Sequence, residues 1–68
     1  MRLQLKLFRI SKKMTQGEFA DKIEVNRVNY SMIEKGKRNG TIVFWNKLKE
    51  TFNIPEDQMW SLMKNEEE

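Results

Sequence analysis

The sequence predicts a single all-α domain built from five short helices. Its 68 residues are enough for one domain with one small core. Apolar residues recur at the spacing of one helix face, and residues that favour helix N-caps precede several of these runs. The chain has no cysteine, so neither disulfides nor a thiolate metal site can stabilise so small a core. We therefore expect one domain over residues 1–68, whose stability depends on its packing or on association.

The first segment fits two patterns. Its leucines alternate with polar residues as in a β-strand, whereas Leu5, Phe8 and the stem of Arg9 have the spacing of one helix face. Leucine, lysine, glutamine and arginine all favour helix. We predict a helix over about residues 5–12, and residues 1–4 stay open as a short extended strand or arm that pairs with the C-terminal segment.

Two further helices with a tight turn between them are predicted over residues 15–35. Thr15 and Glu18 have the spacing of a capping box, in which each side chain bonds the other residue's backbone N–H. Asn26 is the N-cap candidate of the next helix, and Gly36 suits the left-handed residue that ends it. The predicted buried side chains of this pair are Phe19, Ala20, Ile23, Tyr30, Ile33 and the stem of Glu34.

Two more helices are predicted towards the C-terminus. Thr41 caps a helix that runs to about Phe52. Its apolar stripe at helical spacing consists of Ile42, Trp45, Leu48, Lys49 and Phe52. Val43 and Phe44 lie off this stripe, so we expect the helix to bury two faces. Pro55 is predicted at the first position of the last helix.

The composition argues against an enzyme, a metal site or a membrane protein. Histidine, the commonest general base and metal ligand, is absent along with cysteine. No apolar run approaches the roughly 20 residues of a membrane span, and charged residues interrupt the N-terminal apolar stretch. We therefore expect no catalysis, no metal, no cofactor and no membrane contact, and a cytoplasmic location.

Charge is distributed unevenly along the chain. The net charge of +3 combines a balance of +6 over residues 1–40 with −3 over residues 41–68. This division indicates one face for a polyanion and another face for a different partner. Ordinary surface charge that keeps the protein soluble is the alternative. Charge therefore favours nucleic-acid binding without deciding it.

The segment from Phe8 to Phe52 carries several spaced motifs in register. They are Arg9, Thr15-Gln16, Glu18-Phe19-Ala20, Val25-Asn26-Arg27, Ile33-Glu34-Lys35-Gly36 and Lys37-Arg38-Asn39. In these residues the sequence resembles the Cro/C1-type (XRE-like) helix-turn-helix family of phage, plasmid and bacterial repressors, and its length is that of the short stand-alone members. The resemblance implies a five-helix, lambda-repressor-like DNA-binding domain with the helix-turn-helix at residues 15–35.

The resemblance also implies roles for individual side chains. Arg9 and Glu34 would form a buried structural ion pair between the first and third helices. The residues that face the bases would be Arg27, Val28, Asn29, Ser31 and Met32. The residues that contact phosphates would be Gln16, Lys35, Lys37, Arg38 and Asn39. A solvent-exposed helix face followed by a charged loop is the alternative interpretation.

Two residues depart from the family pattern without breaking it. Glu24 stands in the turn where the family usually has glycine, so a left-handed backbone conformation would be less favourable in energy there. Gly40 stands where proline is common in the family.

The C-terminal segment is rich in large apolar residues. Core packing is their default role, but symmetric DNA sites call for two-fold dimers, so residues 54–64 are a candidate dimerisation segment. Its interface residues would be Met59, Trp60 and Met63. Residues 65–68 are expected to be a solvated, frayed tail.

These observations together predict a homodimeric, sequence-specific regulator that binds double-stranded DNA. The family resemblance favours a repressor that places the helix starting at Arg27 in the major groove. No small-molecule effector is expected, because the sequence shows no added sensor domain. The alternative is a protein-interaction module, such as an antitoxin or a regulator-binding partner, that uses the C-terminal aromatic surface.

Overall fold

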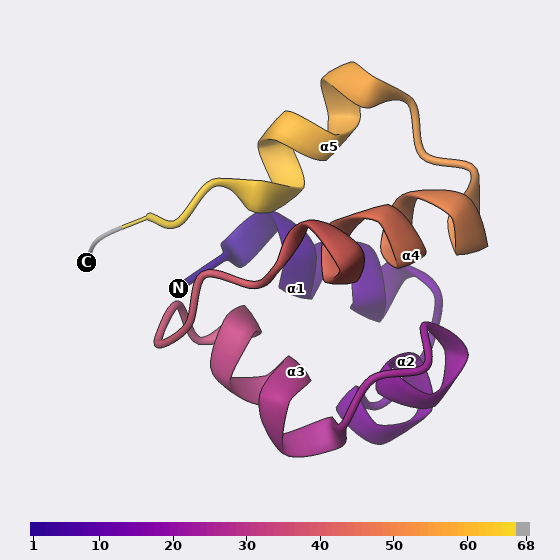
Figure 1. The fold of residues 1–68 in the computed structure, drawn as a ribbon, viewed down its shortest axis with the longest axis vertical. Helices are drawn as coiled ribbons and strands as arrows, with labels where there is room; N and C mark the ends of the chain where they lie inside the picture. The colour runs from indigo at the N-terminus through magenta and orange to yellow at the C-terminus, as the bar shows by residue number, and fades with distance from the viewer. Residues whose placement is uncertain (67–68) are drawn as a thin grey trace.

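The computed structural model describes residues 1–66, and these residues form five α-helices and no strand, which confirms the all-α prediction (Figure 1). The helices are α1 (Leu3–Ser11), α2 (Gln16–Lys22), α3 (Arg27–Glu34), α4 (Ile42–Phe52) and α5 (Glu56–Met63). α2 and α3 form one end of the molecule, α5 lies at the opposite end, and α1 and α4 lie between them (Figure 1). Within the described residues, no helix has the length and apolar character needed to cross a membrane.

Local capping explains where three of the helices begin. The Thr15 hydroxyl accepts from the Glu18 N–H (3.1 Å), and the Glu18 carboxylate accepts from the Thr15 N–H (2.9 Å), so the predicted capping box is present. The Asn26 side chain accepts from the Val28 and Asn29 N–H groups of α3, and the Thr41 hydroxyl accepts from the Phe44 N–H of α4. These caps satisfy donors that a helix cannot pair within itself.

One apolar core joins all five helices. Its buried members are Leu5, Phe19, Ala20, Ile23, Tyr30, Ile33, Phe44, Trp45, Leu48, Ile54, Met59 and Leu62. Phe19 of α2 stacks on Phe52 of α4, with ring centroids 5.1 Å apart, and Phe8 of α1 meets both rings edge-on. This aromatic cluster fixes α2 against α1 and α4, so the helix-turn-helix has a rigid support.

The first helix begins earlier than predicted. α1 starts at Leu3, so only Met1 and Arg2 of the predicted arm precede the helix. The Arg2 N–H donates to the Glu34 carbonyl (2.9 Å), and the Arg2 carbonyl accepts from the Lys6 N–H (3.1 Å). Because this anchor is followed at once by helical hydrogen bonds, the chain forms no strand here.

Met1 pairs with the segment that follows α5. The Glu66 N–H donates to the Met1 carbonyl, and the Met1 ammonium donates to the Glu66 carbonyl, both at 2.9 Å. The ammonium also donates to the Asn65 side-chain oxygen (3.0 Å). The N-terminal arm therefore does meet the C-terminal segment, and residues 65–66 of the predicted tail are held by hydrogen bonds. Residues 67–68 of that tail lie outside the described residues.

The buried face of α4 differs from the predicted stripe. Ile42 is 80% exposed and Val43 is also exposed, whereas Phe44 is buried beside Trp45 and Leu48. The prediction that Ile42 belongs to the buried stripe, and that Val43 marks a second buried face, is therefore wrong. Both residues lie in the first turn of α4, and neither belongs to the apolar core or packs against it.

The start of α5 is also shifted by one residue. Pro55, predicted as the first helical residue, is the N-cap, because its ψ of 149° is extended. A proline cannot cap with its side chain, and here no side-chain cap is formed. Two acidic residues in the first turn, Glu56 and Asp57, instead complement the positive end of the helix dipole.

Candidate nucleic-acid interface

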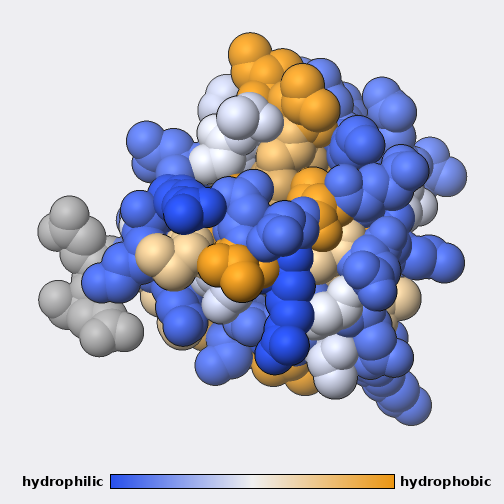
Figure 2. Space-filling model, turned by 60° about the horizontal axis from the view of Figure 1, so that its bottom comes forward, coloured by the Kyte–Doolittle hydropathy of each residue, from blue (hydrophilic) through white to orange (hydrophobic). Residues whose placement is uncertain are grey.

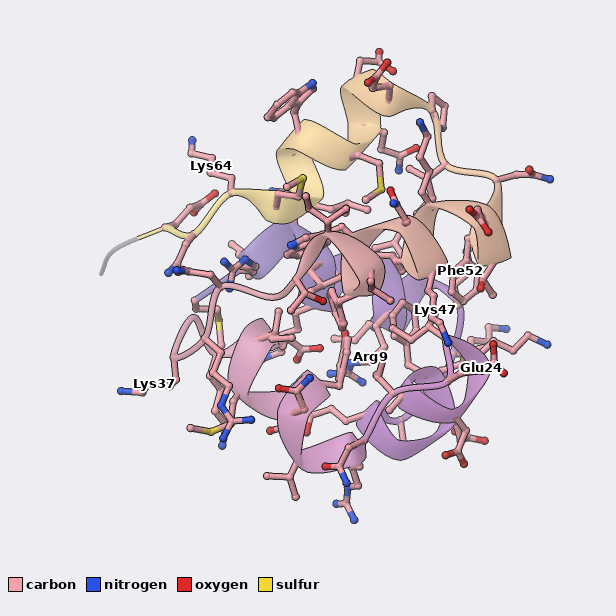
Figure 3. The ribbon with its side chains drawn as sticks, viewed as in Figure 1. Arg9, Glu24, Lys37, Lys47, Phe52 and Lys64 are labelled. Carbon is pink, nitrogen blue, oxygen red and sulfur yellow. The ribbon has the colours of Figure 1, made fainter. Side chains whose placement is uncertain are left out.

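A buried carboxylate ties the first three helices together. Glu34 is only 2% exposed, and it forms the expected ion pair with Arg9, with Arg9 Nε 3.0 Å from Glu34 Oε2. Arg9 Nη2 donates to the other carboxylate oxygen at 3.2 Å, and Gln16 Nε2 donates to that same oxygen at 3.1 Å. The Tyr30 hydroxyl donates to Oε2 from within α3. Figure 3 shows Arg9 directed into the interior between α1 and α3.

The electrostatics of this group favour the charged form of Glu34. Burial alone raises the pKa of the carboxyl, but hydrogen bonds from Arg9, Tyr30 and Gln16 outweigh it and hold the pKa below its usual range. The hydrogen bond to Glu34 in turn raises the pKa of Arg9. Burial, followed by the hydrogen bond to Glu34, raises the pKa of Tyr30. The charged carboxylate of Glu34 is thus favoured in the folded state, where it orients α3 relative to α1 and α2.

The turn between α2 and α3 uses a left-handed residue. Glu24 has φ 59°, so the strain expected from a non-glycine residue at this position is present. The next residue, Val25, donates its N–H to the Ala20 carbonyl (2.9 Å), which closes the turn. Glu24 also forms an exposed ion pair with Lys47 of α4 at 3.6 Å, and Figure 3 shows the two side chains directed toward each other.

The outer face of α3 carries the predicted base-contacting residues. Arg27 and Val28 are exposed, and Asn29, Ser31 and Met32 are half-buried. Arg27 lies beside the start of α2, since a Cβ built on Gly17 would be 3.6 Å from Arg27 Cδ. Figure 2 brings the end of the molecule formed by α2 and α3 forward, and most of that surface is hydrophilic, with separate apolar patches.

The loop after α3 carries most of the predicted phosphate contacts. Lys35, Lys37, Arg38 and Asn39 are all exposed. Figure 3 shows Lys37 directed away from the molecule. Arg38 Nη1 donates to the side-chain oxygen of Asn29 at 2.9 Å, so a predicted phosphate residue lies against a predicted base-reading residue. Gln16, by contrast, is half-buried and engages Glu34, which makes it a brace of α3 in this structure.

Gly40 explains the second departure from the family pattern. Its φ is +77°, which proline cannot adopt, and a Cβ at this position would lie 2.9 Å from Trp45 Nε1. The Trp45 indole N–H donates to the Asn39 carbonyl at 3.2 Å. The loop therefore returns to α4 over the edge of the indole ring, and only glycine leaves room for that approach.

Arg2 was not predicted as a site residue, yet it is 4% exposed and lies directly behind this loop. Its guanidinium donates to carbonyls of α3, of the loop and of α5. Burial lowers the pKa of Arg2, but an arginine remains protonated in proteins. No sequence signal could have identified it, because backbone carbonyls from distant segments leave no residue pattern.

The predicted dimer residues occupy three different environments. Met59 is 6% exposed and belongs to the core, Met63 is half-buried, and Trp60 is 69% exposed. A groove of about 190 Å³ runs between α4 and α5. Its lining includes Ile42, Trp45, Lys49, Glu56, Trp60 and Met63. The structure thus presents one large exposed aromatic side chain beside an apolar groove.

The tight turn between α2 and α3, together with the bonds from Arg9, Gln16 and Tyr30 to Glu34 that hold α3 in place, is the arrangement of a helix-turn-helix domain. Residues 4–68 match the family model described as "Helix-turn-helix domain", and with its spaced motifs the chain belongs to the Cro/C1-type helix-turn-helix regulators. An uncharacterized HTH-type transcriptional regulator of Archaeoglobus fulgidus is 34% identical over 68 aligned residues, covering 88% of this chain and 96% of the relative. No solved structure gives a significant match.

Proposed function

We propose that this protein binds double-stranded DNA in a sequence-specific manner and regulates transcription. The observation that carries the proposal is the brace around Glu34, which fixes α3 with its polar face outward and with a cationic loop directly after it. A helix held in this way can enter the major groove while the following loop meets the phosphate backbone. The similarity to an HTH-type transcriptional regulator of Archaeoglobus fulgidus supports this role.

The exposed side chains fall into two groups, one suited to contact bases and one suited to contact phosphates. Arg27 can bond the O6 and N7 atoms of guanine, and Val28 can contact a thymine methyl group. Asn29 shares one oxygen lone pair with Arg38, which leaves its amide N–H groups free to donate to a base. Lys35 and Lys37 supply charge that neutralises phosphates without reading sequence.

A salt titration tests DNA binding directly. Fluorescence anisotropy with a mixed-sequence duplex should show affinity that falls steeply with salt, because each neutralised phosphate releases counterions. Lys37→Ala should reduce the slope of log affinity against log salt by about 1. Lys64→Ala removes the same charge from a side chain that Figure 3 places far from α3, and it should leave the slope nearly unchanged. Absence of binding below millimolar concentrations at low salt would refute the proposal.

We also propose that the active form is a homodimer that acts as a repressor by blocking access of polymerase. Trp60 and Met63 would meet a second copy beside the groove, and Met59 would support them from the core. The groove carries Lys49 and Glu56, so in a two-fold arrangement each can face the opposite charge on the partner. In such a dimer the two α3 helices would have to lie about 34 Å apart to enter successive major grooves.

A protein-interaction module is the second candidate, and one observation favours it. Ile42 and Trp60 both line the groove and are both largely exposed, as expected for a docking surface for another protein. The salt titration separates the two candidates, since a module of this kind has no need of the charged loop. DNA affinity that is insensitive to loss of Lys37 and Arg38 would favour the module.

A further inference from the structure

The Arg2 guanidinium is a buried cation bonded to backbone carbonyls. Arg2 Nε donates to Met63 O at 3.0 Å, and Nη1 donates to Ile33 O at 2.7 Å and to Arg38 O at 2.8 Å. Nη2 donates to Asn39 O at 3.4 Å. Four of the five N–H donors of the guanidinium are therefore used.

These acceptors come from three separate parts of the fold. Ile33 lies in the last turn of α3, Met63 is the last residue of α5, and the other two acceptors belong to the loop after α3. Carbonyls at helix C-termini carry the negative end of the helix dipole, so they can balance a cation without a carboxylate. The guanidinium also lies 5.5 Å from the centre of the Trp45 ring, which adds a cation–π contact.

Two sets of hydrogen bonds, one from the backbone and one from Arg2, fix the orientation of the loop after α3. The Lys37 and Arg38 N–H groups donate to the Met32 carbonyl at 2.9 and 3.3 Å, so they are tied to α3. The carbonyls of Arg38 and Asn39 are directed inward to Arg2, and the side chains of the loop remain exposed. The backbone of the loop is thus held from behind while its side chains face outward.

We propose that Arg2 is the positioning residue of the loop 37–40, holding the cationic side chains in fixed register with α3. The part of this inference that concerns DNA rests on the proposed function. Arg2 does not touch the ligand; it acts through the carbonyls of the loop. Because Met63 shares the same guanidinium, the end of α5 and the loop are held by one side chain.

Arginine is required at this position for geometric reasons. A lysine ammonium has three donors on a single nitrogen and no planar fork, so it cannot reach carbonyls on several sides of the site. Methionine matches much of the apolar stem but donates no hydrogen bond. Arg2→Lys therefore removes the fork and keeps the charge, and Arg2→Met removes both.

Amide hydrogen exchange in the free protein tests the inference without DNA. Exchange at the Lys37 and Arg38 amides is compared with exchange at the buried Leu48 amide of α4 in the full chain. Both Arg2 variants should raise the ratio of loop to core exchange by about tenfold or more, with the larger effect in Arg2→Met. Lys64→Met, which removes an exposed cation, should leave the ratio unchanged.

DNA binding then supplies the second readout. The Arg2 variants should weaken binding to a mixed-sequence duplex several-fold and lower the salt slope, as if one loop cation were lost. If the Lys37 and Arg38 amides exchange as slowly in both Arg2 variants as in the wild type, the inference is wrong. An equal rise at the loop and at Leu48 would also overturn it, because Arg2 would then support only the whole fold. Selective loosening of the loop in a protein that never binds DNA would support the positioning role and refute the proposed function.

Discussion

At the scale of single residues, Glu34 is the side chain on which the position of α3 depends most. Both of its oxygens accept from other side chains, and no buried side-chain nitrogen or oxygen among the described residues lacks a partner. Removing the carboxylate would leave the Arg9 cation buried without its counter-charge, at a cost of about 3–5 kcal/mol. The ion pair was predicted from the family resemblance, whereas the bonds from Gln16 and Tyr30 to the same carboxylate emerge only from the packing.

The pH dependence of stability should reveal this carboxylate. The pKa of Glu34 is lower in the folded state, so its contribution is present above the unfolded pKa of about 4.3 and is lost as pH falls through the folded pKa. Urea unfolding midpoints between pH 2 and pH 7 should show a loss below about pH 4 in the wild type. Glu34→Gln should be less stable at neutral pH and show a smaller acid loss. An unchanged acid loss would assign the effect to other carboxyls.

The strained turn residue leads to a stabilising substitution. A left-handed residue with a side chain costs roughly 1–2 kcal/mol, and glycine costs about 0.5–1 kcal/mol of extra chain entropy, so Glu24→Gly should stabilise the protein by up to about 1 kcal/mol. Loss of the exposed pair with Lys47 subtracts little. Asn53 is also left-handed, but asparagine tolerates this conformation, so Asn53→Gly should gain less. Thermal unfolding compares the two, and a destabilised Glu24→Gly would contradict the strain argument.

At the scale of elements, the three helix starts that have a side-chain cap were predicted correctly, whereas the starts of α1 and α5 and part of the buried face of α4 were not. Thr15, Asn26 and Thr41 cap as predicted, because capping depends on residues within one turn. The buried side of α4 depends on where α1, α2 and α5 lie, and the apolar Ile42 gave the wrong face for that reason. The buried face of α3 was predicted correctly, because Tyr30, Ile33 and the stem of Glu34 have the spacing of one helix face and all three are buried.

The exposed face of α3 gives a prediction about specificity. If Arg27 reads guanine, Arg27→Ala should reduce discrimination at one base pair by about 1–3 kcal/mol. Anisotropy titrations with a selected site and with single-base variants of it measure this difference. Lys35→Ala, which removes a cation near the other end of α3, should weaken all duplexes alike. Equal losses on selected and mixed DNA in Arg27→Ala would make Arg27 a phosphate contact.

At the scale of the whole molecule, the charge division in the sequence does not correspond to the two ends of the fold (Figure 1). Residues 15–34, which include α2 and α3, carry two basic and four acidic side chains, so the excess positive charge of residues 1–40 lies in residues 1–14 and 35–40. The cationic part of the proposed DNA surface is therefore the loop after α3, which a charge balance over half of the chain could not identify. The groove between α4 and α5 could not be predicted, because it needs the relative position of two helices.

The exposed tryptophan gives a prediction about assembly. Trp60→Ala should raise the dissociation constant of the dimer at least tenfold, since a central tryptophan typically contributes about 2 kcal/mol or more to an interface. Sedimentation analysis across micromolar concentrations measures the change. Leu7→Ala truncates an exposed apolar side chain of α1 outside the lining of the groove and should have little effect. A wild type that remains monomeric at high micromolar concentration would defeat the dimer proposal.

The pairing of Met1 with residues 65–66 has a practical consequence for the choice of fusion partner. A purification tag placed before Met1 turns the ammonium into an amide, which has one N–H where the ammonium donates to both Asn65 and Glu66. The tag must also leave the molecule beside Arg2 and therefore beside the loop that Arg2 holds. A tag attached after Glu68 leaves the ammonium intact, so binding constants measured with tags at opposite ends of the chain should not be treated as interchangeable.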